Sequence, residues 1–174
     1  VLNAFCYTGG FTLACLAGGA QSVVSVDSSA PALALGRANL ARNPTLDASR
    51  AQWVEADVFA ELRRLRDAGA SFDLIVLDPP KFAPTAHHAE RAARAYKDIN
   101  LLALKLLAPG GCLATFSCSG GIDAALFQKI VAGAAHDARA DAAIVGRFAA
   151  AADHPVALAF PEGEYLKGLL VRKA

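Results

Sequence analysis

Short apolar segments alternate with segments of helical character along most of this 174-residue chain. The apolar segments, which we expect to be strands, read VLNAF, SVVSVD, AQWVEAD, FDLIVLD and GCLATFS. Helical patterns lie between them, over residues 12–17, 30–43, 59–68 and 92–107. Apolar strands separated by helices indicate a parallel sheet that is covered on both faces. The alternation therefore predicts a doubly wound α/β fold.

The last third of the chain departs from this alternation. A helical pattern over residues 123–138 is followed by AAIVGRFA, by a proline-flanked turn region and by YLKGLLVR. We expect these last two apolar segments to form an antiparallel hairpin at the edge of a mostly parallel, seven-stranded sheet. No linker or repeat divides the sequence, so residues 1–174 are predicted to form one domain.

The composition excludes several classes of protein. A hydrophobic content of 55% argues against disorder, and no apolar run approaches the roughly 20 residues of a membrane span. The net charge of +1 provides no overall basic field for binding RNA. Four cysteines without CxxC or zinc-like spacing predict neither disulfides nor a metal site, and favour a cytoplasmic location. Because the chain lacks methionine and starts on a strand-like VLNA, we expect a fragment of a longer protein.

Residues that suit a nucleoside follow the first three predicted strands, at the sheet edge where α/β folds bind ligands. After the first strand, the Gly9-Gly10 pair permits a tight turn and a close approach to a ligand. Asp27 ends the second strand and is placed to accept hydrogen bonds from ribose hydroxyls, while Ser28 or Ser29 could cap the next helix. Asp57 follows the third strand and could accept from an adenine amino group. The alternative is that these residues only make turns and helix caps.

The glycine pattern discriminates between two cofactors. The G-x-G-x-x-G pattern that cradles the diphosphate of a nicotinamide cofactor is incomplete, because Leu13 and Ala14 stand where a third glycine is expected. S-adenosylmethionine has a ribose and an adenine but no phosphate, so it fits these residues better. A nicotinamide-dependent oxidoreductase and a non-catalytic RNA-binding or assembly module remain as alternatives.

The fourth predicted strand ends on Asp78-Pro79-Pro80-Lys81-Phe82. Two prolines fix the backbone after the acid, so its carboxylate is held rigidly and could face a planar base. A tyrosine in the fourth position of this pattern would indicate methylation of an exocyclic amino group. Lys81 breaks that pattern, although Phe82 could still stack on a base. The alternative is a strand that is simply ended by prolines.

Cys118 follows the fifth predicted strand, within TFSCSGG. Cytosine C5 is a weak nucleophile, and a thiolate that adds to C6 would activate it through a covalent intermediate. Asp78 is the candidate acid that stabilises the pyrimidine during this addition. A buried, inert thiol is the alternative, and Cys112 at the other end of the same strand exemplifies it.

Basic residues lie between Asp78 and Cys118 in the sequence and could meet phosphates. The cluster comprises Lys81, His87, His88, Arg91, Arg94 and Lys97. A solvated helix face is an equally good explanation of each residue taken alone.

Seven motifs together resemble the bacterial 23S ribosomal RNA large-subunit methyltransferase I family: VLNAFCYTGGF, VVSVDSS, FDLIVLDPPKF, YKDIN, TFSCSG, AADHP and PEGEYLKG. The resemblance implies a Rossmann-like class I methyltransferase domain that transfers a methyl group from S-adenosylmethionine to C5 of a cytosine in 23S rRNA, leaving S-adenosylhomocysteine. It also implies a PUA domain and a β-rich connecting domain upstream. Related enzymes with D-P-P-T-F loops methylate guanine, so the identity of the methylated base stays open. The group that removes the C5 proton and the formation of a homodimer also stay open.

The predicted site residues fall into three groups. The cofactor group is Phe5, Tyr7, Thr8, Gly9, Gly10, Asp27, Ser28, Asp57, Val58, Asp78 and Pro79. Cys118 is the predicted nucleophile, with Asp78 as its catalytic partner. Lys81, Phe82, Arg94 and Lys97 are the predicted substrate-binding residues.

Overall fold

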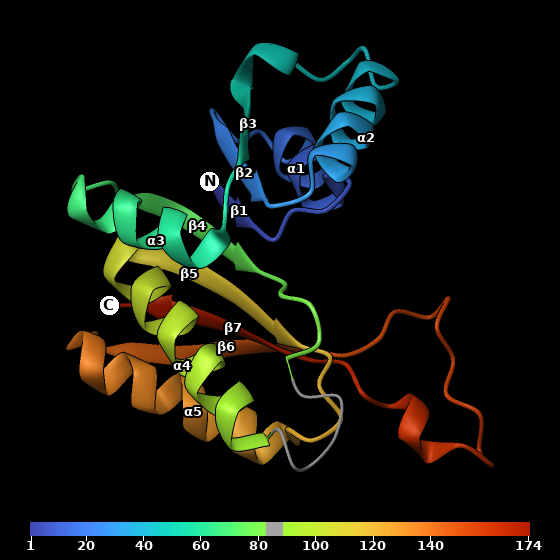
Figure 1. The fold of residues 1–174 in the computed structure, drawn as a ribbon, viewed down its shortest axis with the longest axis vertical. Helices are drawn as coiled ribbons and strands as arrows, with labels where there is room; N and C mark the ends of the chain where they lie inside the picture. The colour runs from blue at the N-terminus through green and yellow to red at the C-terminus, as the bar shows by residue number, and fades with distance from the viewer. Residues whose placement is uncertain (83–88) are drawn as a thin grey trace.

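The computed structural model describes residues 1–82 and 89–174, which form a seven-stranded sheet with helices on both faces (Figure 1). The strands are β1 (Leu2–Ala4), β2 (Val23–Asp27), β3 (Ala51–Glu55), β4 (Phe72–Leu77), β5 (Leu107–Ser117), β6 (Ala142–Phe148) and β7 (Lys167–Lys173). The helices are α1 (Gly10–Ala17), α2 (Ala30–Ala41), α3 (Val58–Asp67), α4 (Ala89–Leu106) and α5 (Ala124–Ala138), with 3₁₀ turns η1 (Ala48–Arg50) and η3 (Pro161–Gly163).

The strand order β3-β2-β1-β4-β5-β7-β6 confirms the predicted doubly wound architecture. Strands β1 to β5 pair in parallel, and β7 lies antiparallel between β5 and β6. Helices α1 and α2 cover one face of the sheet, and α3, α4 and α5 cover the other (Figure 1). Strands β2 and β3 are added on one side of β1, and β4 and β5 on the other, so the strand order switches between β1 and β4. That switch point is where ligands bind in sheets of this kind.

Two apolar clusters fix the helices to the sheet. The larger lies under α3, α4 and α5 and includes the fully buried Ile75, Tyr96 and Phe127. The smaller joins α1 and α2 to the other face, where Leu16 and Leu40 pack beside the partly buried Trp53. Both clusters consist of apolar residues of the strands and helices, and this packing holds the strands, and therefore their ends, in fixed positions.

Strand β5 is longer than predicted, because it starts at Leu107 rather than at Gly111, where the predicted GCLATFS strand begins. Leu107 pairs with Phe72, and the register shifts between Phe72 and Leu74. A Cβ atom on Gly111 would lie 3.0 Å from the carbonyl oxygen of Asp73. The glycine thus permits an irregular close approach of two backbones, and the strand continues through it.

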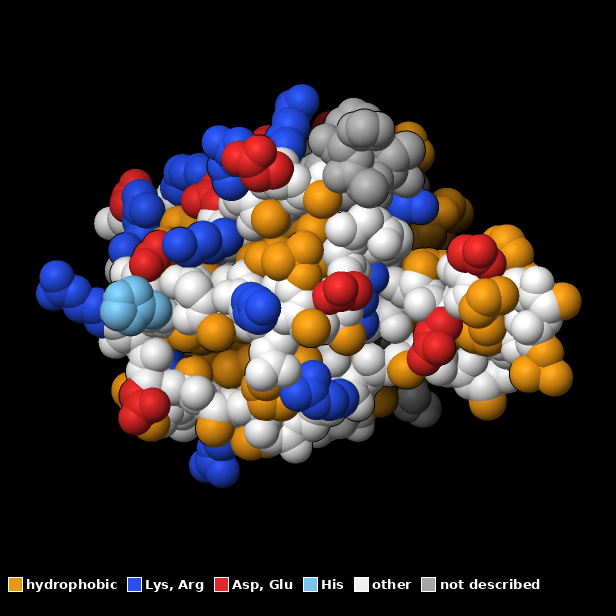
Figure 2. All heavy atoms as spheres, turned by 90° about the horizontal axis from the view of Figure 1, so that it is seen from below, with side chains coloured by type: hydrophobic (Ala, Val, Ile, Leu, Met, Phe, Trp, Pro, Cys, Tyr) orange, Lys and Arg blue, Asp and Glu red, His pale blue; other side chains and the backbone are white. Residues whose placement is uncertain are grey.

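A long segment between β6 and β7 projects away from the body of the domain (Figure 1). Its apolar side chains Val156, Leu158 and Phe160 are exposed. In the view of Figure 2 the projecting part carries apolar and acidic side chains. Among the residues that the structure describes, no helix is both long and apolar enough to cross a membrane.

Candidate functional site

A cavity of about 400 Å³ opens at the switch point, beside the carboxyl ends of β1, β2 and β4. Its volume lies within the range of about 300–1,000 Å³ that is typical of small-molecule pockets. The residues that line it are Phe5, Tyr7, Asp27, Ser28, Asp78, Pro79 and Pro80. All but Pro80 belong to the predicted cofactor group, so the fold brings these six members of the group together from three separate loops.

The loop after β1 has an unusual backbone conformation. Phe5 and Tyr7 have positive φ angles of 60° and 48°, and Gly9 has a φ of 80°. Positive φ is costly for residues with a side chain and persists only where the surroundings enforce it. Here the Tyr7 N–H donates to Oδ2 of Asp27 at 2.8 Å, and the Gly9 N–H donates to the Cys6 carbonyl at 2.8 Å. The loop is thus held open, with the Tyr7 side chain 69% exposed at the edge of the cavity.

Asp27 joins the loops that follow β1 and β2. Besides the bond from Tyr7, its Oδ1 accepts the Ser29 N–H at 2.9 Å. Ser29 in turn caps α2, because its Oγ accepts the Ala32 N–H at 3.3 Å. The predicted cap is confirmed. Each carboxylate oxygen has a second lone pair, so Asp27 can still accept from a ribose, and that role stays a prediction.

The two glycines of this loop serve different purposes. A Cβ atom on Gly9 would lie 2.5 Å from Cη2 of Trp53, so Gly9 is required by packing as well as by its φ angle. A Cβ atom on Gly10 would have no neighbour within 4 Å. Gly10 therefore borders open space at the N-terminus of α1, where a ligand can approach the backbone. Next to them, the Thr8 carbonyl accepts the Asn39 side-chain amide at 3.1 Å, which ties the loop to α2.

Asp57 and Val58 begin helix α3. Oδ1 of Asp57 accepts the Ala60 N–H at 2.9 Å, which makes Asp57 the N-cap of the helix. Val58 is buried in the larger apolar cluster. Neither residue is among those that line the cavity. Asp57 is nevertheless exposed, and it follows β3 at the same edge of the sheet.

Asp78 and Cys118 meet beside the cavity. The Cys118 Sγ lies 3.9 Å from the carbonyl oxygen of Pro79, which lines the cavity wall. Burial raises the pKa of the Asp78 carboxyl. Burial also raises the pKa of the Cys118 thiol, and the negative charge of Asp78 adds to that effect, while Lys81 and Lys167 oppose it. The two groups are thus electrostatically coupled: a proton on Asp78 removes one obstacle to a thiolate at Cys118.

Phe82 lies in an aromatic cluster. Its ring centroid is 4.9 Å from that of Tyr96, 5.9 Å from that of Phe59 and 6.3 Å from that of Phe5. The ring is partly buried against the larger apolar cluster. These contacts give Phe82 a part in holding the Pro79-Pro80 loop against α4, and base stacking by its ring stays a prediction.

The predicted basic cluster is dispersed in the structure. Arg94 forms an ion pair with Glu90 within α4, at 2.6 Å. Lys97 pairs with Asp137 at 2.7 Å, near the C-terminal end of α5, which is remote from the strand ends that form the cavity. His87 and His88 lie outside the described residues. Among the described basic residues of the cluster, Lys81 is the one that acts on Cys118.

Sequence reasoning missed two residues next to Cys118. Lys167 at the start of β7 donates from Nζ to the carbonyl oxygens of Ser119 and Tyr165, at 2.8 Å each. The Tyr96 hydroxyl lies 3.0 Å from Oγ of Ser119. The sequence places Lys167 in a predicted strand and in the PEGEYLKG motif but gives it no role at the site, because the pairing of β7 with β5 depends on a contact between distant parts of the chain.

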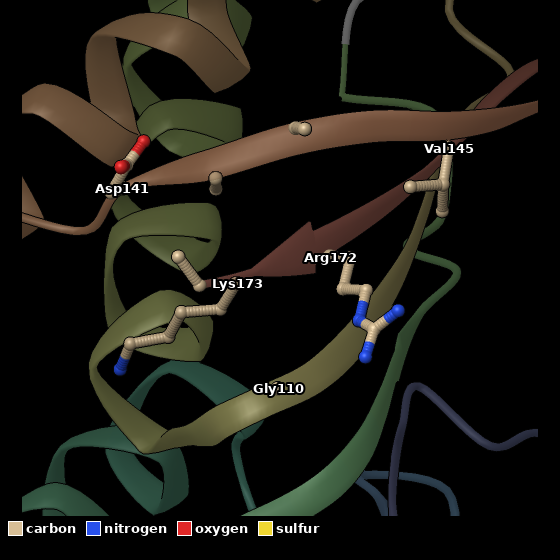
Figure 3. Close-up of a pocket in the computed structure, with 8 residues that line it drawn as sticks. Gly110, Asp141, Val145, Arg172 and Lys173 are labelled. Atoms are coloured by element: carbon tan, nitrogen blue, oxygen red, sulfur yellow. The ribbon is translucent and has the colours of Figure 1, made fainter.

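A second hollow of about 420 Å³ lies at the opposite edge of the sheet. Gly110, Asp141, Val145, Arg172 and Lys173 surround it, at the starts of β5 and β6 and the end of β7 (Figure 3). It contains none of the predicted site residues and lies away from the carboxyl ends of the parallel strands. In residues 1–82 and 89–174 no group of three or more His, Cys, Asp or Glu side chains is placed to hold a metal ion.

Comparisons with known proteins agree with this geometry. The family described as S-adenosylmethionine-dependent methyltransferase matches residues 1–158. A protein named Ribosomal RNA large subunit methyltransferase I from Aeromonas hydrophila is 56% identical over 172 residues, which cover 99% of this chain and 43% of that protein. A protein of the same name from Cronobacter sakazakii is 54% identical over 168 residues, or 97% of this chain and 42% of that protein.

A solved structure shares the fold closely. The crystal structure of SMU.776, complexed with S-adenosylhomocysteine, superposes with a TM-score of 0.85 at 25% sequence identity. The superposition covers 98% of this chain and 44% of that one. The chain therefore spans less than half the length of each of these three proteins.

Proposed function

The chain belongs to the S-adenosylmethionine-dependent methyltransferase family, and on that basis we propose that it methylates C5 of a cytosine in 23S ribosomal RNA. The relatives named for the large ribosomal subunit support the RNA substrate. The contact of Cys118 Sγ with the carbonyl oxygen of Pro79, a residue of the cavity wall, together with its electrostatic interaction with Asp78, is the observation that carries the choice of cytosine. Membership of a methyltransferase family disfavours the alternative of a nicotinamide-dependent oxidoreductase.

The cavity suits the cofactor of the family. Gly10 leaves space for a ligand, Asp27 retains acceptor capacity and Tyr7 offers an exposed ring, so the residues present fit an adenosine group. Bound S-adenosylmethionine would supply an electrophilic methyl group on a sulfonium sulfur. Asp27 would bind the ribose and Asp57 the adenine amino group, while Asp78 and Pro79 separate the cofactor from the base.

Cys118 has the role of nucleophile. Its thiolate forms a bond from Sγ to C6 of the cytosine, and the electron pair of the C5–C6 double bond becomes available at C5 for the methyl group. After methylation the C5 proton leaves, the Sγ–C6 bond breaks and the double bond and the thiolate are restored. Burial raises the pKa of Asp78, so this carboxyl takes up a proton more readily than a solvated one, and in the protonated form it donates a hydrogen bond to the pyrimidine ring and makes C6 more electrophilic.

Residues 1–174 act in this proposal as the catalytic domain of a longer protein. A PUA domain and a β-rich domain upstream would bring most of the RNA contacts, because the net charge of this domain is only +1. Lys81, which follows the rigid proline pair, would meet a phosphate near the target base. The reaction would take place in the cytoplasm, where rRNA is available.

The test compares Cys118→Ala with Cys112→Ala in the full-length protein, using an rRNA transcript and labelled S-adenosylmethionine. Cys112 is a matched control because it lies in the middle of β5, whereas Cys118 directly follows the end of that strand. We expect Cys118→Ala to abolish labelling and Cys112→Ala to retain it. Retained labelling with Cys118→Ala would exclude the covalent mechanism.

A second experiment identifies the base. RNA that contains 5-fluorocytosine cannot lose its C5 substituent after methylation, so the adduct should persist and be found on the Cys118 peptide by mass spectrometry. Nucleoside analysis of normal product should give 5-methylcytidine. A methylated guanosine, with no adduct, would favour the alternative base, and cofactor binding without any methylated nucleoside would favour a non-catalytic RNA-binding module.

A further inference from the structure

The strand after the projecting segment places a lysine against the loop that carries Cys118. In the antiparallel ladder between β5 and β7, Lys167 is the Cα partner of Ser117, the residue before Cys118. Its Nζ donates to the carbonyl of Ser119, the residue after Cys118, at 2.8 Å. The lysine therefore contacts the chain on both sides of the thiol.

The ammonium group is held in place rather than free to move. Besides Ser119, Nζ donates to the carbonyl of Tyr165 at 2.8 Å, so these two carbonyls use two of its three N–H donors. The residue is partly buried between β5 and the segment that precedes β7. Because this cation is already fixed, little further loss of entropy is needed when a negative charge develops nearby. Enzymes stabilise reactive anions with preorganised groups of this kind.

We propose that Lys167 is a positioning residue that stabilises the Cys118 thiolate and fixes the 117–119 loop against β7. This inference rests on the proposed function, in which Cys118 is the nucleophile. When the thiol ionises, its proton passes to solvent, and the resulting negative charge is balanced by the ammonium of Lys167. The lysine does not touch the base, so it acts through Cys118.

Several other titratable groups interact with Cys118 or with Lys167. Lys81 acts on the thiol in the same sense as Lys167, while Asp78 acts in the opposite sense. Tyr96 from α4 interacts with the thiol, and Asp123 interacts with Lys167 from the start of α5. Lys81 is exposed, whereas burial lowers the pKa of Lys167 and the Cys118 thiol partly restores it. The charge of the partly buried Lys167 is therefore less screened by solvent and salt than that of the exposed Lys81.

The experiment measures how fast iodoacetamide alkylates Cys118 as a function of pH, in the full-length protein, with peptide mass spectrometry to separate the cysteines. Lys167→Gln should raise the pKa of the Cys118 thiol and slow its alkylation at pH 8 by roughly three- to tenfold, as expected for loss of a partly solvated opposite charge. Lys167→Arg keeps the charge and should restore most of the rate. The pH dependence of methylation should shift in the same direction.

Lys173→Gln is the matched control. Lys173 lies at the other end of β7 and also donates to two carbonyl oxygens, of Leu104 at 3.1 Å and Leu107 at 2.7 Å. Its replacement should affect stability but leave the alkylation of Cys118 unchanged. If Lys167→Gln melts below the assay temperature, Lys167→Met replaces it, because methionine keeps the aliphatic stem without burying an unpaired polar group.

The result that overturns the inference is an alkylation profile of Cys118 that is the same in the wild type, Lys167→Gln and Lys167→Met. A slowing that Lys173→Gln reproduces would also overturn it, because the effect would then be general loosening of β7. Failure of the proposed function is a separate result. It would be seen as methylation that survives Cys118→Ala, whatever Lys167 does to the thiol.

Discussion

Gly36→Ala should destabilise this protein even though it removes a glycine from the middle of a helix. In an open helix position, alanine is favoured over glycine by about 0.5–1 kcal/mol. A Cβ atom at position 36, however, would lie 2.5 Å from Cζ3 and 2.7 Å from Cη2 of Trp53. Overpacking of this kind typically costs about 1–3 kcal/mol, so the clash outweighs the helix preference.

Gly133→Ala in α5 is the matched control. There the nearest atom to the new Cβ would be Cε of Lys97 at 3.6 Å, which is ordinary van der Waals contact. Both variants gain the same helix preference, so their difference in unfolding free energy should equal the overpacking cost of about 1–3 kcal/mol. For a chain of this size that corresponds to melting temperatures roughly 2–12 °C apart, with Gly133→Ala the more stable.

The same pair of variants tests the link to the cofactor. Gly36 and Gly9 both approach the same end of the Trp53 ring, at Cζ3 and Cη2, so a displaced ring should disturb the loop after β1. Calorimetry should show weaker S-adenosylhomocysteine binding for Gly36→Ala and unchanged binding for Gly133→Ala. Adding Trp53→Leu to Gly36→Ala should recover part of the stability through a favourable coupling energy. If Gly36→Ala proves as stable as Gly133→Ala, the packing argument is refuted.

Three further outcomes follow from the site. Asp57→Ala should cost about 0.5–2 kcal/mol through loss of the cap on Ala60, whereas Asp57→Asn, which also caps well, should melt near the wild type. Burial raises the pKa of Asp78 in the folded protein, so wild-type stability falls as pH rises through its titration; Asp78→Asn should therefore melt higher at pH 7, with the difference vanishing at low pH. Lys97→Ala should lower the free energy of unfolding by at most about 1 kcal/mol, because its pair with Asp137 is exposed. In a calorimetric or filter-binding titration, the slope of log RNA affinity against log salt concentration should stay unchanged.

The positions of Asp27, Asp78 and Cys118 could be predicted from sequence because each follows an apolar strand of the parallel sheet. Parallel strands put their carboxyl ends at one edge, so the order of residues along the chain was enough to group them. The contacts of Lys167 and Phe82 could not be predicted in this way. Lys167 depends on β7 entering the sheet beside β5, and Phe82 depends on the packing of α4 against the proline loop.

The insertion of β7 between β5 and β6 gives the domain a fixed order of completion during synthesis. Strand β6 leaves the ribosome first, but in the sheet it pairs with β7 alone. Until β7 emerges, β5 has an open hydrogen-bonding edge and β6 has no partner, a state that exposes strands to misassembly. Lys167 reaches the Cys118 loop only in this last step. A nascent chain would thus complete the surroundings of Cys118 only when β7 joins the sheet.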